Sequence, residues 1–264
     1  KNQILSHSQL AAIRAHFTNG EIQDQFEHLD IAGIEGWKCF HPDASLSQFR
    51  WTTTDPIKAK LALDQVVRRM GANSRKFTWL CDGHSRHFDL NPLLDELGFS
   101  HSLDVHVMMK DLSPTDAEQV KESTFYCREF ENEIVSANIL ASAFDVSDEI
   151  AAYFHRLYLA PSQKHQTTIF AACTQDTDEA VGVGYMSALS GTSTVFLRVA
   201  GILPDYQRLG LYRILVRKRI EVAAAEGYTT AYVHAYSFEA AALLEKEGFN
   251  KMAEVSLHTG PSGK

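Results

Sequence analysis

The residues best suited to chemistry lie between 202 and 215, where a strand-like segment ends and a helix-like segment begins. This stretch reads Ile-Leu-Pro-Asp-Tyr-Gln-Arg-Leu-Gly-Leu-Tyr-Arg-Ile-Leu, so a Pro-Asp turn precedes a helix that opens around Gly210. The first turn of a helix has main-chain N–H groups without intrahelical acceptors, and its dipole favours negative charge. Glycine allows close approach of the main chain to a ligand. We therefore predict a diphosphate-binding turn here.

Five basic side chains accompany this turn and the expected helix: Arg208, Arg213, Arg217, Lys218 and Arg219. They stand out because the chain is acidic, with 25 Lys and Arg against 33 Asp and Glu and a net charge of -8. They could bind further phosphate or could form an ordinary solvated helix face, and the sequence leaves both interpretations open. The overall negative charge argues against nucleic acid or a membrane as a partner.

Cysteine and histidine spacing gives little support for a metal site or a disulfide scaffold. His84 and His87 lie three residues apart with Asp89 beyond them, but polar turns often produce such clusters, and we expect no metal. The four cysteines form no Cys-x-x-Cys pair, which favours reduced thiols. Residues 1–20 show no apolar run of the signal-peptide type, so we expect a cytoplasmic protein.

The elements that must position the turn occur twice along the chain. Residues 93–99 (Leu-Leu-Asp-Glu-Leu-Gly-Phe) and 243–249 (Leu-Leu-Glu-Lys-Glu-Gly-Phe) match at a separation of 150, and each reads as a helix ended by a glycine. In both copies a helix and a strand come before this motif: 57–70 and 77–81 in the first, 210–226 and 229–235 in the second. The repetition predicts two tandem α/β domains, 1–112 and 113–264.

Further helices and strands are expected upstream in the second copy. Apolar spacing predicts helices over 129–144 and 147–159, with Asp145 and Ser147 as cap candidates between them. Alternation predicts strands over 167–174, 180–187 and 195–202. The charge-free stretch 180–197 contains glycines and a Ser/Thr cluster, so two strands around a turn explain it better than a membrane span. The expected architecture is a twisted mixed sheet flanked by helices.

With these elements in place, the turn resembles the signature of the GNAT superfamily of acyl-CoA-dependent N-acetyltransferases. That signature reads Gln/Arg-x-x-Gly-x-Gly/Ala after a strand and a Pro-Asp-Tyr type of turn. Gln207 and Gly210 match it, as does the turn at residues 204–206, whereas Tyr212 departs from it at the last position. The resemblance covers about residues 113 to 264, and the first copy resembles a decayed version of the same unit.

The resemblance implies a CoA site in the second copy. The pantetheine arm would pair like an added strand with Ala200, Gly201 and Ile202, for which strand packing is the alternative. A main-chain N–H of this strand would stabilise the tetrahedral oxyanion. Ser237 stands where many members have a cofactor-contacting asparagine, or it caps the next helix. The diphosphate would follow Gln207 and rest on the main-chain N–H groups of Arg208, Leu209, Gly210, Leu211, Tyr212 and Arg213.

The resemblance also implies that an amine acceptor loses a proton before it attacks the thioester. The strand before the turn has no Asp or Glu, and Tyr232 stands where several members hold a glutamate. His234, on the same expected strand face, is our candidate base because an unperturbed pKa of about 6.5 leaves it mostly neutral at pH 7. A structural histidine is the alternative. Leu244 replaces the family's frequent tyrosine acid, for which Tyr236 and Tyr212 are substitutes.

We therefore expect an enzyme that moves the acetyl group of acetyl-CoA to a primary amine of a small molecule or peptide. The alternatives are a non-catalytic CoA-binding or regulatory module and an enzyme that transfers a longer acyl group. In the first copy only Asp55-Pro56 separates the strand expected at 49–54 from its helix, so we expect no CoA there. By resemblance to tandem family members, that copy would instead pack against the second and wall the acceptor pocket.

Overall fold

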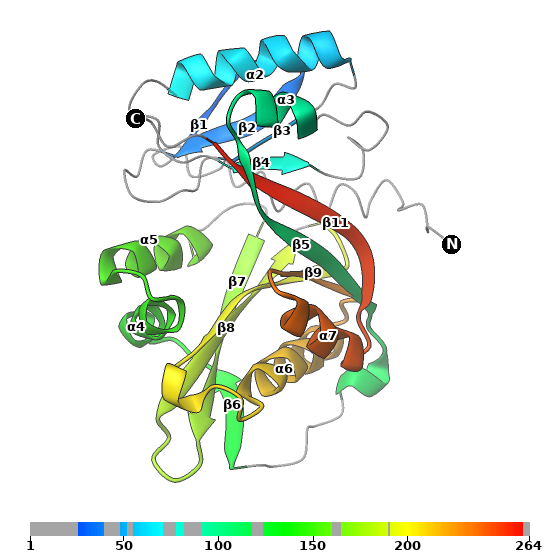
Figure 1. The fold of residues 1–264 in the computed structure, drawn as a ribbon. Coiled ribbons are helices and arrows are strands. Elements are labelled where there is room, and N and C mark those ends of the chain that lie inside the picture. Colours follow the sequence, from blue (N-terminus) through cyan, green and yellow to red (C-terminus); the bar gives the residue numbers. More distant parts are fainter. Residues whose placement is uncertain are drawn as a thin grey trace. The chain divides into compact units, whose positions relative to one another are not determined.

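The computed structural model describes residues 26–39, 48–51, 55–70, 78–81, 91–117, 124–159, 165–189 and 191–260 (Figure 1). The helices are α2 (Pro56–Met70), α3 (Asn91–Glu96), α4 (Glu133–Phe144), α5 (Asp148–Leu159), α6 (Leu211–Ala225) and α7 (Phe238–Lys246). Two short 3-10 turns are η2 (Pro114–Ala117) and η3 (Pro204–Tyr206). The strands are β1 (Phe26–His28), β2 (Ile34–Cys39), β3 (Gln48–Trp51), β4 (Thr78–Cys81), β5 (Ser100–Asp111), β6 (Phe125–Glu129), β7 (His165–Thr174), β8 (Ala180–Leu189), β9 (Thr194–Ile202), β10 (Thr230–Ala235) and β11 (Asn250–Thr259).

The chain forms two compact units that are not continuous in sequence. Unit 1 comprises residues 1–107, 235–238 and 251–264, and unit 2 comprises residues 108–234 and 239–250. The first junction lies near the domain boundary expected at residue 112. The sequence predicts a continuous second domain over 113–264, but the C-terminal segment 251–264 is not part of unit 2. It groups with unit 1 because β11 pairs with β4, with Ser256 opposite Cys81.

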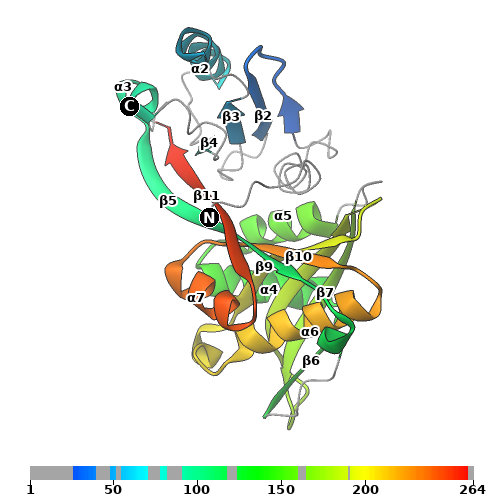
Figure 2. The same cartoon turned by 90° about the vertical axis from the view of Figure 1, so that its right-hand side faces the viewer.

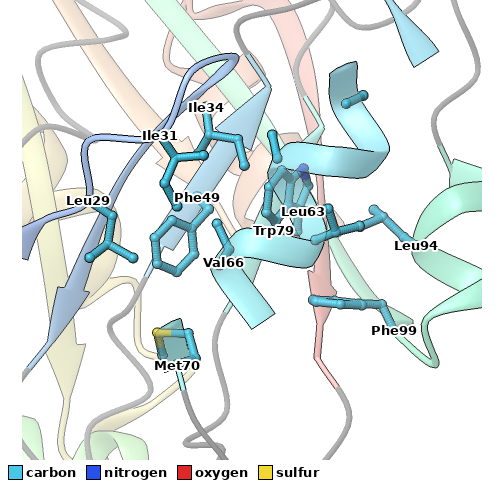
Figure 3. Close-up of a cluster of buried hydrophobic side chains, with 12 residues drawn as sticks. Leu29, Ile31, Ile34, Phe49, Leu63, Val66, Met70, Trp79, Leu94 and Phe99 are labelled. Atoms are coloured by element: carbon cyan, nitrogen blue, oxygen red, sulfur yellow. The ribbon is translucent and has the colours of Figure 1, made fainter. Parts of the chain in front are cut away.

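Unit 1 is built on a small mixed sheet with α2 packed against it. Strands β1, β2 and β3 pair antiparallel, β3 and β4 pair parallel, and β4 pairs antiparallel with β11. Helix α2 buries Ala59, Leu63 and Val66 in the same cluster as the rings of Phe49 and Trp79 (Figure 3). Those two rings stack with their centroids 6.1 Å apart. The apolar face of α2 thus supplies the core of this unit.

Unit 2 carries strands in the order β10-β9-β8-β7-β6, antiparallel except for the parallel pair β9 and β10. In β8, Tyr185 contacts His155 of α5, whereas a side chain at Gly184 would meet Arg219 of α6. Successive residues of a strand point to opposite faces. Helices α5 and α6 therefore cover opposite faces of this sheet, as the two views show (Figure 1, Figure 2).

The internal repeat has the same local geometry in both copies. Gly98 has a φ of 77° and Gly248 a φ of 87°, values that favour glycine at a helix C-terminus. In each copy the phenylalanine after the glycine donates its N–H to a leucine five positions earlier: Phe99 to Leu94 at 2.9 Å and Phe249 to Leu244 at 3.0 Å. The helix ends that the sequence predicts are therefore confirmed.

One helix begins later than the sequence predicts. A helix was expected over 129–144, but Glu129 belongs to β6 and lies opposite Phe170 of β7. Helix α4 begins at Glu133 because Asn132 Oδ1 accepts a hydrogen bond from Val135 N at 3.1 Å. This N-cap satisfies a donor of the first turn. The cap, rather than the apolar spacing, sets the boundary.

Within the charge-free stretch at 180–197, residues 180–189 form β8 and residues 194–197 begin β9, so the two strands that the sequence predicts are confirmed. Within the described ranges, no helix is both long enough and apolar enough to cross a lipid bilayer.

Candidate functional site

The turn between β9 and α6 has a main-chain conformation that favours glycine at its end. After β9, η3 reverses the chain, and Tyr206 N–H donates to Leu203 O at 2.9 Å. Arg208 then has a φ of 64° and Gly210 a φ of 84°. A side chain at Gly210 would meet nothing within 4 Å. Glycine is thus required here by the positive φ and not by crowding.

The main-chain N–H groups of residues 208–213 have no hydrogen-bond acceptor among the described residues. The first hydrogen bond of α6 runs from Ile214 N to Gly210 O at 3.2 Å, and Gly210 has no side chain to cap the helix. These donors lie at the positive end of the helix dipole. They fit the oxygens of a diphosphate, as the sequence suggests.

The corresponding helix start in the first copy is occupied by a carboxylate. Asp55 Oδ1 accepts hydrogen bonds from Ile57 N at 3.0 Å and from Lys58 N at 3.3 Å. This cap satisfies first-turn donors of α2 and places a negative charge where an anion would bind. The two copies therefore differ chemically at the same place: Gly210 leaves its donors open, and Asp55 fills its own.

Strand β9 extends beyond its pairing with β10. The parallel pairing ends at Leu197, whereas β9 continues to Ile202 alongside β8. Leu203 N–H donates to Val181 O of β8 at 2.9 Å, and the main-chain groups of a strand alternate between its two sides. The groups of Ala200 and Ile202 therefore face away from β8, toward the edge that β10 has left. An extended ligand could pair with this edge.

A β-bulge in β9 decides which main-chain groups reach this edge. The pairs on either side of it are Gly184 with Ala200 and Met186 with Leu197. Strand β9 thus has one extra residue, so that Arg198 and Val199 both lie opposite Tyr185. A shift of one residue exchanges the two sides of a strand. The bulge therefore turns Ala200, rather than Gly201, toward the open edge.

Gly201 allows α4 to pack closely on β9. A Cβ at this position would lie 2.9 Å from Ala143 Cβ and 3.2 Å from Leu140 Cδ2. The residue thus has a packing role, which was the alternative interpretation for this part of the strand. Gln207, from the signature, donates from Nε2 to Ile202 O at 3.4 Å and links the turn to the strand end.

The basic side chains of α6 are mostly engaged by carboxylates, which corrects the interpretation of a phosphate-binding helix face. Arg213 and Arg217 both donate to Glu247, with Arg217 Nε 2.6 Å from Oε2. Lys218 Nζ lies 2.6 Å from Glu221 Oε1. Burial alone would raise the pKa of Glu247, but the hydrogen bonds from Arg217 and Arg213 hold it below its ordinary value. Charge on this helix is therefore largely neutralised locally.

His234 lies in an aromatic cluster that it shares with Phe196 and Tyr232. The rings of Phe196 and Tyr232 stack at 4.5 Å between centroids, and the His234 ring lies 5.3 Å from that of Phe196. Tyr232 and His234 thus share one strand face, as predicted. Burial lowers the pKa of His234 to about 3, so the ring is neutral at pH 7 and takes up a proton only at high cost. This favours a structural role over a general base.

The other candidate side chains are dispersed. Tyr236 and Ser237 follow β10, are exposed and group with unit 1. Tyr212 is half-buried in the first turn of α6, and burial raises its pKa, so its phenol keeps its proton. Leu244 is fully buried in α7. The position to which the resemblance assigns an acid is therefore apolar here.

The sequence did not single out a buried polar pair on the sheet face covered by α5. His155 Nδ1 and Tyr185 Oη lie 2.7 Å apart, and both side chains are buried. Glu133 Oε2 lies 3.7 Å from His155 Nε2, but burial dominates and lowers the pKa of His155. The available signal was spacing, because His155 follows the buried Ala151 by four positions on an amphipathic helix.

A second unpredicted polar group lies in the middle of β9. Arg198 is buried, donates from Nε to Ser187 Oγ and lies over the Phe196 ring, with Cζ 5.5 Å from its centroid. Ser187 Oγ is 2.7 Å from Thr167 Oγ1. Arg198 is the single charged residue in the sequence from 180 to 204, which was the signal available for it.

In the part of the chain that the structure describes, no group of three or more His, Cys, Asp or Glu side chains could hold a metal ion. His84, His87 and Asp89 lie outside the described residues.

Comparison with known families matches the part of the chain that carries this geometry. Residues 137–249 match the model of the Acetyltransferase (GNAT) family. This segment includes the open edge of β9, the turn and α6. No curated protein matches the chain.

Solved structures share the fold over nearly the whole chain. A GCN5-related N-acetyltransferase from Kribbella flavida covers 96% of both chains with a TM-score of 0.71 and 14% identity. A functionally unknown conserved protein from Staphylococcus epidermidis covers 92% of this chain and 96% of its own, with a TM-score of 0.64 and 12% identity. A tandem GNAT protein from the clavulanic acid biosynthesis pathway covers 88% of this chain and 79% of its own, with a TM-score of 0.61 and 10% identity. The chain therefore has the mixed α/β fold of the GNAT acetyltransferases.

Proposed function

We propose that the chain is a tandem GNAT acyltransferase whose unit 2 binds acetyl-CoA and transfers its acetyl group to a primary amine of a small molecule or peptide. The observation that carries the proposal is the turn at residues 208–213, whose N–H groups have no acceptor among the described residues. The GNAT fold supports acyl transfer from CoA in general. Acetyl as the acyl group and a primary amine as the acceptor are parts of the proposal.

The chain's own groups would hold the co-substrate at two places. The diphosphate would accept hydrogen bonds from the turn at 208–213. The pantetheine arm would pair with the main-chain groups of Ala200 and with the N–H of Ile202, whose carbonyl accepts a hydrogen bond from Gln207. When bound, acetyl-CoA supplies an activated thioester. Gln207 links the two binding elements by a hydrogen bond, so they would hold the nucleotide and the thioester in fixed positions relative to each other.

Transfer would form a bond between the amine nitrogen and the acyl carbon, break the thioester C–S bond and release CoA as the thiolate, while the proton lost by the nitrogen passes to water. A thiol pKa of about 8.5 makes that thiolate a tolerable leaving group without an acid at Leu244. The low pKa of His234 makes it a weak proton acceptor. We infer that the acceptor amine enters as the free base, having lost its proton to water. His234 would then have a packing role, as a neutral ring in the aromatic cluster with Phe196 and Tyr232.

Unit 1 would not bind CoA in this proposal. The Asp55 carboxylate takes the first-turn donors of α2 and would repel a diphosphate. The match between the helix ends at Gly98 and Gly248 supports a common origin of the two copies.

A non-catalytic CoA-binding module is the second candidate. Two observations favour it: Leu244 is buried where the family often has its acid, and burial suppresses protonation of His234. Both candidates keep the cofactor site, so turnover separates them.

Calorimetry with acetyl-CoA and a thiol-release assay with a panel of primary amines test the proposal. We expect the wild-type chain to bind acetyl-CoA and to release thiol only when an amine is present. Gly210→Glu places a carboxylate at the open turn and should abolish binding. That carboxylate would accept hydrogen bonds from the first turn of α6, as Asp55 does at the start of α2, and would repel a diphosphate. Binding without amine-dependent release would favour the module, and absence of binding by the wild type would refute both candidates.

A further inference from the structure

A fully buried arginine lies directly beside the bulge of β9. Arg219, in α6, has no exposed surface. Its Nη1 donates to Tyr185 O at 3.0 Å and to Arg198 O at 3.2 Å, and its Nε donates to Leu215 O at 3.0 Å. The first two carbonyls belong to the residues that face each other across the bulge. The guanidinium therefore bridges β8 and β9 at the point where their register changes.

The site around Arg219 is formed to hold this side chain. A Cβ at Gly184 would lie 3.1 Å from Arg219 Cζ and 3.3 Å from both Nε and Nη1. The guanidinium thus occupies the space above a strand residue that has no side chain. A larger residue at Gly184 would displace it, so the glycine and the arginine depend on each other sterically.

The charge of Arg219 is not compensated by a carboxylate. No carboxylate among the described residues acts on its charge, and Nη2 is buried without a hydrogen-bond acceptor among them. Burial lowers the pKa of Arg219, with opposing contributions only from Tyr212 and Cys127. A buried, unpaired cation is unfavourable for folding. An apolar side chain of similar size would remove that cost, which indicates that the guanidinium has a task besides packing.

We propose that Arg219 is the positioning residue for the thioester arm: by holding the carbonyls of Tyr185 and Arg198 it fixes the bulge that turns Ala200 and Ile202 toward the open edge of β9. The inference rests on the proposed function of unit 2 and deepens it. Arg219 acts through the main chain, and its hydrogen bonds go to Leu215, Tyr185 and Arg198 rather than to the N–H groups at 208–213, so it governs the pantetheine half of the site and leaves the diphosphate donors alone.

Two ligands separate these halves. One ligand is 3′-phospho-ADP, called phospho-ADP below, which is CoA without its pantetheine arm and uses only the turn. The other is acetyl-CoA, which uses the turn and the β9 edge. Two strand-type hydrogen bonds should make the wild type bind acetyl-CoA roughly 10- to 100-fold more tightly than phospho-ADP. The measured quantity is this affinity ratio, determined by calorimetry for each variant.

Arg219→Met should reduce the ratio to below about 3-fold while the affinity for phospho-ADP stays within about 2-fold of the wild type. Arg219→Lys, which retains one donor and the charge, should give an intermediate ratio, and so should Gly184→Ala, which only displaces the guanidinium. These two variants carry the test if Arg219→Met does not fold. Lys218→Met, on the same helix, is the matched control and should leave the ratio unchanged.

The outcomes distinguish the two proposals. Failure of the wild type to bind either ligand would overturn the proposed function and this inference with it. If the wild type shows the expected ratio and folded Arg219 and Gly184 variants keep it, the proposed function stands and Arg219 has only a structural role. Equal loss of affinity for both ligands would likewise overturn the positioning role, because it would indicate general damage to the unit.

Discussion

Helix α6 is flanked by two glycines that offer a matched test of the binding turn. Gly210 precedes the helix with a φ of 84°, and Gly227 follows it with a φ of 86°. A side chain at either position would meet nothing within 4 Å. Alanine therefore adds the same left-handed strain at both places, about 1 to 2 kcal/mol, without a steric clash. Only Gly210 belongs to the turn whose donors are open.

Gly227→Ala should lower the free energy of unfolding by about 1 to 2 kcal/mol, and Gly210→Ala by that amount or less, depending on how far its turn relaxes. For a chain of this size, each kcal/mol corresponds to a decrease in Tm of about 2 to 4 °C. Gly210→Ala can relax its exposed turn in the free protein, and acetyl-CoA must then restore the strained form on binding. The part of the about 1 to 2 kcal/mol that relaxation relieves is lost from binding instead, and full relaxation gives a roughly 5- to 30-fold loss of affinity. Gly227→Ala should bind acetyl-CoA like the wild type.

Thermal unfolding and calorimetry on the same preparations measure both quantities. The reasoning would be refuted if Gly227→Ala weakened acetyl-CoA binding as much as Gly210→Ala, since strain anywhere along α6 would then account for the loss. It would also be refuted if Gly210→Ala unfolded earlier but bound acetyl-CoA normally. In that case the φ at this position would matter for folding alone.

Three further changes test other parts of unit 2. Gly201→Val should destabilise the chain by about 1 to 3 kcal/mol in chemical denaturation, because its side chain would collide with α4, and an unchanged midpoint would contradict that packing. His234 is neutral in the folded chain, so stability should fall as the pH decreases from about 6.5 toward 3, and His234→Phe should make this pH dependence shallower; identical slopes would argue against the buried neutral ring. Glu247→Gln should cost about 2 kcal/mol near neutral pH, a difference that disappears as the pH falls through the lowered pKa of the carboxyl; a constant difference would show that Arg213 and Arg217 do not depend on its charge.

Local patterns in the sequence were sufficient for most elements of unit 2 and for the turn. The expected strand at 195–202 and helix at 210–226 are observed as β9 and α6, because alternation and the 3.6-residue period report directly on neighbouring residues. Gly210 was identified for the same reason: the start of a helix without a side-chain cap can be recognised from a short segment.

Local sequence patterns could not predict that β11 joins the sheet of unit 1, nor which partners the basic side chains of α6 have. The pairing of β11 with β4 joins residues more than 170 positions apart, and nothing in either strand's own pattern specifies its partner. By sequence, Arg213 and Arg217 could bind phosphate or form a solvated helix face, and only the structure shows that Glu247, in the turn after α7, accepts hydrogen bonds from both. The start of α4 was also missed because one side-chain hydrogen bond from Asn132 outweighs apolar spacing.

The sequence alone determined where the helices and strands of unit 2 lie and where a helix begins with open N–H groups, because these depend on contacts a few residues apart. Only the tertiary structure decided which charges remain available. Arg219 and Arg213 belong to the same basic run, yet one is buried against the β9 bulge and the other pairs with Glu247 near the surface. The physical reason is that burial and pairing depend on which distant segments approach, which no local pattern records.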